Sequence, residues 1–324
     1  MAGSLTLGIV SDIHYACAAE QARGSDYESR DLSLPLRTLL RAYRHFVWLR
    51  EPLHQNHLLD RFIAGARPYD YVVANGDFSC DTGFCGLSDE ASFQSARECL
   101  AKLEKNFGGK LLATLGDHEL GKVSFFGGRG GMRLASWERA TSEAGLKPFW
   151  KIQAGRYVLM GIVSSLVALP VFEPELSPEE RDRWHELREE QMAGIREGFR
   201  SLQSGQRVLV FCHDPTALPF LWKESEVQAR ASSIEATVIG HLHSKLILWN
   251  SKILAGIPRI PFLGNSVRRM TEALRDARYW RPFKVRLCPS LAGIELLKDG
   301  GFLTATLDLA GEEPARFQFH PIHR

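Results

Sequence analysis

Histidines and aspartates recur in short groups along this chain, and each group directly follows an apolar run. The groups are Asp12-Ile13-His14, Gly76-Asp77, Gly116-Asp117-His118-Glu119, Cys212-His213-Asp214 and Gly240-His241-Leu242-His243. Imidazole and carboxylate are ligands that first-row transition metals bind in proteins. The groups therefore predict a metal site that is assembled from distant parts of the sequence.

The apolar runs before these groups are typical of strands buried on both faces, because polar and apolar residues do not alternate within them. They cover residues 5–10, 71–74, 110–115, 157–163, 207–211 and 236–239. Residues 91–107 and 177–202 carry apolar side chains at helical spacing, so helices separate several of the strands. Alternating strands and helices predict an α/β sandwich with a largely parallel or mixed sheet.

The second half of the chain holds further apolar runs, which we interpret as antiparallel strands added to the sheets. These runs are residues 245–249, 252–255, 293–297 and 302–307. Lys298-Asp299-Gly300-Gly301 separates the last two and is a hairpin turn signal. In open α/β sheets ligands bind beyond the carboxyl ends of the strands, where the histidine and aspartate groups are expected.

The spacing within the groups supports a common centre. Asp12 and His14 are two residues apart, so an extended backbone would turn both side chains to one side, and His241 and His243 repeat this spacing. Taken singly, each histidine is also compatible with a hydrogen-bonded structural role, and each aspartate with a helix cap or a turn. Five groups in series, each at the end of a predicted strand, favour the metal site.

This ordered set of motifs resembles that of the calcineurin-like metallophosphoesterase superfamily, and the match runs from Asp12 to His243. The resemblance implies a four-layered αββα sandwich with mixed sheets. We expect one domain over residues 1–324, with insertions at about 15–57 and 259–286. The implied enzyme is a binuclear metallophosphoesterase, in which a water or hydroxide bridging two metals attacks a phosphomonoester or phosphodiester directly.

The resemblance also implies a role for each matching residue. Asp12, His14 and His243 would hold the first metal, Asp77 would bridge, Asp117, His213 and His241 would hold the second, and His118 would act on the leaving group. Manganese, iron, zinc or a mixture of them would satisfy this ligand set. The sequence does not specify the substrate, the choice between monoester and diester, or the oligomeric state.

Two positions depart from the family pattern. Asp117 stands where the family has asparagine; it keeps a metal-binding oxygen but brings a negative charge and lacks the amide donor. Cys80 stands where many members carry an aspartate that orients the catalytic histidine. Asp81 and Glu119 are the candidates to replace that aspartate.

Three segments carry arginines beyond the metal motifs. In the loop 127–133, Arg129 and Arg133 are candidates to bind the substrate phosphate, although a plain surface loop is favoured. Segment 259–286 mixes arginines with aromatic residues, which suits either a nuclease or nucleotide phosphodiesterase, or an amphipathic helix with packed aromatics and solvated arginines. We favour the amphipathic helix.

Residues 36–49 predict another amphipathic helix. This helix could be a lid, a partner surface, a membrane-surface helix or a helix that simply covers the fold, and we favour the covering helix.

Composition gives the remaining expectations. The formal net charge of +2 does not indicate a nucleic-acid partner. The six scattered cysteines are typical of reduced thiols, and neither a signal peptide nor a transmembrane segment is evident, so a cytoplasmic protein is expected. A non-catalytic scaffold with this fold is the rival to an enzyme. Such a scaffold should have lost several ligands, whereas every ligand position is filled here.

Overall fold

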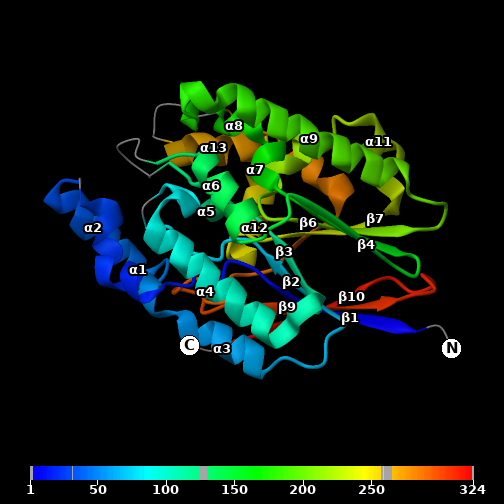
Figure 1. Cartoon of the computed structure of the whole chain (residues 1–324), viewed down its shortest axis with the longest axis horizontal. Helices are drawn as coiled ribbons and strands as arrows, with labels where there is room; N and C mark the ends of the chain where they lie inside the picture. Colours follow the sequence, from blue (N-terminus) through cyan, green and yellow to red (C-terminus); the bar gives the residue numbers. More distant parts are fainter. Residues whose placement is uncertain are drawn as a thin grey trace.

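Two five-stranded sheets pack face to face and helices cover their outer faces, as the computed structural model shows (Figure 1). The structure describes residues 3–30, 32–82, 84–123, 130–256, 258 and 265–322. The strand orders are β10-β9-β1-β2-β3 and β4-β5-β6-β7-β8. Each sheet contains both parallel and antiparallel pairs, so the predicted αββα sandwich with mixed sheets is confirmed.

The first sheet contains the strands that precede the first three motifs. Its strands are β1 Ser4–Val10, β2 Tyr71–Asn75, β3 Leu111–Thr114, β9 Gly301–Asp308 and β10 Arg316–Pro321. β1, β2 and β3 run parallel, so their carboxyl ends meet at one edge of the sheet. β9 pairs antiparallel with β1, and β10 with β9.

The second sheet contains the strands that precede the last two motifs. Its strands are β4 Phe149–Ala154, β5 Tyr157–Ile162, β6 Arg207–Cys212, β7 Ile234–Ile239 and β8 Val285–Leu287. β5 to β8 run parallel, and every residue of β5 is buried. This confirms the expectation that an apolar run without alternation forms a strand covered on both faces.

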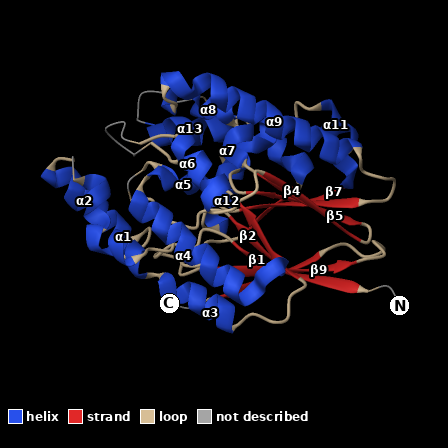
Figure 2. Cartoon of the chain, viewed as in Figure 1, coloured by secondary structure: helices blue, strands red, loops and turns tan. Residues whose placement is uncertain are grey.

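Helices form the two outer layers (Figure 2). Their bounds are α1 Ala18–Arg23, α2 Leu34–Phe46, α3 Asn56–Ala64, α4 Glu90–Phe107, α5 Asp117–Leu120, α6 Leu134–Glu138, α7 Ser164–Val167, α8 Leu169–Phe172, α9 Arg181–Arg200, α10 Leu218–Leu221, α11 Ser225–Ala229, α12 Lys245–Ile253 and α13 Asn265–Arg275. The predicted helices at 91–107, 177–202 and 36–49 correspond to α4, α9 and α2. None of the described helices has the length and apolarity that a membrane span requires.

The three large apolar clusters among the described residues follow from the layers. Between the sheets, Leu7 and Ile9 of β1 meet Leu209 and Phe211 of β6. α3 and α4 pack against the outer face of the first sheet. α9 packs against the outer face of the second sheet through residues such as Ile195. Both sheets are thereby fixed relative to each other, and with them the strand ends that carry the motifs.

Three strand predictions in the second half of the chain are wrong. Residues 245–249 and 252–255 lie mainly in one helix, α12. Ser244 caps the N-terminus of this helix, because its hydroxyl accepts a hydrogen bond from the Leu246 N–H. Residues 293–297 form turns, and the Glu295 N–H donates to the Trp48 carbonyl, so no hairpin joins this segment to β9. β9 instead finds its partners in β1 and β10.

Segment 259–286 forms α13 and a 3₁₀ helix, Ala277–Phe283; residues 259–264 lie outside the described part of the chain. Trp280 and Phe283 are buried in the core under the second sheet. Arg268 is also buried and donates to Glu175 at 2.7 Å. Trp280 and Phe283 therefore pack as the amphipathic interpretation expected and cannot stack on nucleic-acid bases. The expectation of solvated arginines is wrong for Arg268, which is buried against Glu175.

Candidate metal centre

The motif residues sit in tight loops at the carboxyl ends of the strands, and five of them adopt a left-handed backbone conformation. Their φ values are 50° at Asp12, 50° at His14, 57° at Asp77, 57° at His241 and 57° at His243. This conformation is costly for residues other than glycine and gathers at functional sites. The expected extended backbone at Asp12-x-His14 is therefore wrong, although both side chains reach the same cluster.

Close backbone packing brings these loops together. A Cβ on Gly240 would lie 2.0 Å from Ser11 Oγ and 2.5 Å from Asp12 Oδ2. A Cβ on Gly116 would lie 2.1 Å from Asp77 Oδ1. The glycines before the ligand residues are thus required by the space that neighbouring carboxylates occupy.

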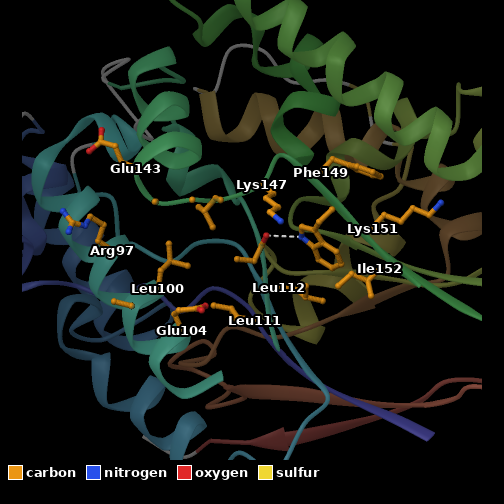
Figure 3. Close-up of a pocket in the computed structure, with 16 residues that line it drawn as sticks. Arg97, Leu100, Glu104, Leu111, Leu112, Glu143, Lys147, Phe149, Lys151 and Ile152 are labelled. Carbon is orange, nitrogen blue, oxygen red and sulfur yellow. Dashed lines mark hydrogen bonds between the residues drawn. The ribbon is translucent and has the colours of Figure 1, made fainter. Parts of the chain in front are cut away.

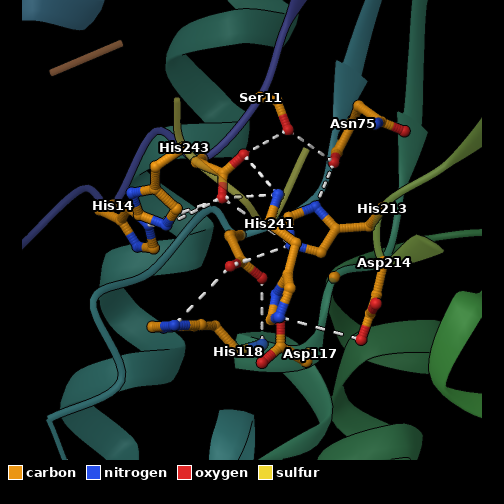
Figure 4. Close-up of polar contacts among 12 residues, drawn as sticks. Ser11, His14, Asn75, Asp117, His118, His213, Asp214, His241 and His243 are labelled. Atoms are coloured by element: carbon orange, nitrogen blue, oxygen red, sulfur yellow. Dashed lines mark hydrogen bonds and ion pairs between the residues drawn. The ribbon is translucent and has the colours of Figure 1, made fainter. Parts of the chain in front are cut away.

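The seven predicted ligands converge beyond the carboxyl ends of the strands. Figure 4 labels five of them: His14, Asp117, His213, His241 and His243. One group joins Asp12, His14 and His243, with donor atoms within 4.8 Å of one another. His243 Nε2 lies 3.2 Å from Asp12 Oδ1 and 3.4 Å from His14 Nε2. Asp12 comes from the end of β1 and His243 from beyond β7, so each sheet contributes to this group.

The second group joins Asp117, His213 and His241 with Asp77. Asp117 Oδ1 lies 3.0 Å from His241 Nδ1 and 3.4 Å from His213 Nε2. Asp77 Oδ2 lies 3.1 Å from His213 Nε2. Asp77 also forms a group with His14 and His118, so its carboxylate lies between the two sets of ligands.

The donor set fits a cation, as His213 shows most clearly. Its Nδ1 lies 2.6 Å from the Asn75 carbonyl, and its buried Nε2 lacks a hydrogen-bond partner although carboxylate oxygens surround it. When Nδ1 carries the proton that the carbonyl accepts, the Nε2 lone pair faces those oxygens. Only a positive charge between them, a proton or a metal ion, makes this arrangement favourable.

The pKa values of His213 and His241 also indicate that positive charge is favoured in the cluster. Burial opposes protonation of His213, but Asp77 and Asp12 together raise its pKa well above the ordinary value. His241 is partly exposed, and there Asp214 and Asp117 outweigh desolvation and raise its pKa to about 9. Burial and the neighbouring His14 lower the pKa of His243 well below the ordinary value. Protons on His213 and His241 thus balance the carboxylates, and metal ions would take over that role.

His118 lies beside the cluster with a fixed ring. Its Nδ1 lies 2.9 Å from the Cys80 carbonyl, and its Nε2 contacts Lys122 Nζ and lies 3.7 Å from Asp77 Oδ2. Burial lowers the pKa of His118 to about 3. The backbone of Cys80 therefore orients this ring where an aspartate side chain was expected to do so.

Neither proposed substitute for that aspartate reaches His118. Glu119 accepts hydrogen bonds from the N–H groups of Asp77, Phe78 and Gly116 at 2.8–3.0 Å. It thereby ties the second motif to the third. Asp81 accepts from the Gly86 N–H.

The two candidate phosphate-binding arginines are not brought to the cluster by any described contact. Arg129 lies outside the described residues. Arg133 donates to the carbonyls of Met132 and Gly130, so its guanidinium is used within its own loop.

Three contributors to the site were missed at the sequence level. Lys122 follows His118 by four residues, a spacing that places side chains on one face of a helical turn. Asn75 holds His213 through its backbone carbonyl, which no side-chain pattern reveals. Asp214 Oδ2 lies 3.9 Å from His241 Nε2, and its position directly after His213 was the available signal.

A cavity of about 450 Å³ opens beside the cluster and is lined by His14, His118 and His243. A larger cavity of about 690 Å³ lies between β3 and β4 (Figure 3). Its labelled side chains include Arg97, Glu104 and Lys147, and it shares no lining residue with the cluster. Chemistry is therefore expected at the smaller cavity, where titratable groups converge.

No protein-family model matches this chain, and no curated protein matches it. Among solved structures, it is similar to a phosphopantetheinyl hydrolase from Mycobacterium tuberculosis, with 16% identity and a TM-score of 0.34 over 75% of this chain and 84% of that chain. It is also similar to a purple acid phosphatase from yellow lupin (Lupinus luteus) seeds, with 10% identity and a TM-score of 0.35 over 75% of this chain and 38% of that chain.

At these identities and scores, neither structure carries an activity or a substrate to this chain. The chain's own two-sheet sandwich agrees with the αββα fold that the resemblance implied, and Asp and His side chains gather in order at the strand ends.

Proposed function

We propose that this chain is a metal-dependent phosphoester hydrolase with two metal ions, which cleaves a phosphomonoester or a phosphodiester by direct attack of water. The observation that carries the proposal is the division of the ligands into two groups with the Asp77 carboxylate between them. Two metal ions in such a site activate water and stabilise the attacking and leaving oxygens of an in-line displacement.

The two groups divide the ligands between the metals. Asp12, His14 and His243 would hold one ion. Asp117, His213 and His241 would hold the other, and Asp77 would be shared. Manganese, iron and zinc all suit this set of imidazoles and carboxylates.

His118 and Lys122 are assigned to the leaving group. The Lys122 ammonium donates a hydrogen bond to His118 Nε2, and both residues line the cavity. A proton carried by Lys122 is therefore available beside the imidazole. The Cys80 carbonyl keeps the ring in this orientation. A departing alkoxide beside His118 can take that proton from Lys122, which is left as a neutral amine, so that no full negative charge develops on the oxygen.

Phosphate release from a panel of monoesters and diesters, with manganese, iron or zinc added, tests the proposal. We expect activity in the wild type and its loss in Asp77→Asn. Asp182→Asn makes the same change at an exposed position of α9 and should leave activity unchanged. Hydrolysis by Asp77→Asn at the wild-type rate would contradict the proposed centre, and so would the absence of hydrolysis from every ester and metal combination.

A further inference from the structure

The cavity beside the cluster has a metal-binding end and an apolar end. His14, His118 and His243 form its inner end. Its opposite wall comes from α2 and the segment that follows, within the long passage between β1 and β2. At about 450 Å³ the cavity is within the usual size range of small-molecule sites, roughly 300–1,000 Å³.

The outer wall is apolar and aromatic. Its apolar side chains are Leu40, Tyr43, Trp48, Leu49, Leu53 and Phe84. The Trp48 ring lies 5.0 Å from the His243 ring and 6.4 Å from the Tyr43 ring, measured between centroids. A row of rings therefore leads from the metal ligands outward along the cavity.

Charge is distributed unevenly along the same cavity. Its cationic side chains are Lys122, in contact with His118, and Arg44, which donates to the Ser25 carbonyl at 3.1 Å. Among the described residues that line it there is no aspartate or glutamate outside the neighbouring ligand cluster. An anionic group is thus favoured in the cavity, and its place is at the histidine end, where Lys122 stands.

From this arrangement, and given the proposed function, we infer that the substrate is a phosphate ester of an apolar alcohol, whose aryl or alkyl group fills the cavity walled by Tyr43 and Trp48. The phosphate lies at the cluster, and the ester oxygen lies beside His118. The apolar group then extends along the ring row. A sugar or another highly hydroxylated leaving group would lose its hydrogen bonds to water there without gaining enough partners.

Phosphonates, which cannot be hydrolysed at the carbon–phosphorus bond, isolate binding from catalysis. Calorimetric titration of the metal-loaded wild type with methyl-, butyl- and hexylphosphonate measures the contribution of the apolar group. Full burial of a methylene tightens binding by about fourfold. We expect hexylphosphonate to bind at least about 30-fold more tightly than methylphosphonate, since burial of the chain in the cavity is partial. Benzylphosphonate provides the aryl arm, and its affinity relative to butylphosphonate tells which kind of group the rings prefer.

Variants locate the binding to this cavity. Tyr43 is half-exposed. Trp48→Ala and Tyr43→Ala should each weaken the binding of hexylphosphonate by about tenfold and change the binding of methylphosphonate by less than about twofold. Phe46→Ala is the matched control, because Phe46 is on the same helix as Tyr43, is 66% exposed and does not line the cavity. It should bind both ligands as the wild type does.

Two results would overturn the inference: equal affinity for methyl- and hexylphosphonate, or a preference for hexylphosphonate that both cavity variants retain. The outcome is separable from the proposed function. Chain-length-dependent binding without hydrolysis of any ester would leave the cavity assignment standing and refute the hydrolase. Hydrolysis without any preference for apolar esters would support the hydrolase and refute the cavity assignment.

Discussion

Gly240 is the point at which the cluster should be most sensitive to one added methyl group. A Cβ on this residue would lie 2.0 Å from Ser11 Oγ, 2.5 Å from Asp12 Oδ2 and 3.0 Å from His213 Nδ1. Carbon atoms in favourable contact are separated by roughly 3.5–4.0 Å, so Gly240→Ala must displace Ser11 and Asp12 by about 1 Å or more.

The expected cost has two parts. Overpacking of a buried site lowers the free energy of unfolding by about 1–3 kcal/mol. Displacing the Asp12 carboxylate and the His213 ring should also weaken metal binding by at least the 10–100-fold that is typical of losing a supporting contact. The first effect is independent of metal, and the second is specific to the cluster.

Urea unfolding of metal-free protein measures the first effect, and metal titration of the folded protein measures the second. Gly109→Ala is the control, because Gly109 is exposed and a Cβ there would have no neighbour within 4 Å. It should change the free energy of unfolding by no more than about 1 kcal/mol. If Gly240→Ala unfolds at the wild-type urea concentration and binds metal as the wild type does, the close packing of the strand ends is not what positions the ligands.

Three further substitutions test individual roles. Asp77→Asn should reduce the content of both metals, whereas His14→Ala should chiefly weaken metal binding by the group of Asp12, His14 and His243. If elemental analysis shows that Asp77→Asn loses only one metal ion per chain, the Asp77 carboxylate is not shared. His118→Asn should retain the metals and lower kcat by about 10²–10⁴-fold, less for nitrophenyl esters, whose leaving group needs no proton. Loss of metal in this variant would refute its assignment. Asp117→Asn should lower metal affinity and raise monoester turnover relative to diester turnover, because it removes a negative charge beside the phosphate. If the ratio of monoester to diester turnover stays constant or falls in Asp117→Asn at saturating metal, the Asp117 charge does not limit the turnover of monoesters.

The sequence predicted which side chains gather better than it predicted the backbone that holds them. Strong apolar runs located β1, β5 and β6, because a strand buried on both faces needs a continuous apolar sequence. β4 and β10 were missed because each is an edge strand with exposed residues, so its sequence lacks such a run. α12 was mistaken for strands because its short apolar stretch has no distinct period.

Within the site, the limits have a similar physical origin. Residue types and order predicted which side chains gather, and they lie together in the structure. Asp12 and His14 adopt left-handed conformations, and their N–H groups donate to the carbonyls of Gly76 and Asp77 in another loop, which residue spacing does not encode. Likewise, the Cys80 carbonyl holds the His118 ring, and a backbone carbonyl is present at every position of any sequence. Contacts made by the backbone are therefore the part that the sequence could not predict.

The measurement that tests the central claim most directly is elemental analysis of purified, metal-supplemented wild-type protein. The arrangement of the ligands in two groups around Asp77 predicts about two transition-metal ions per chain. A protein that retains no transition metal would contradict the proposed centre and favour a non-catalytic scaffold with the same fold.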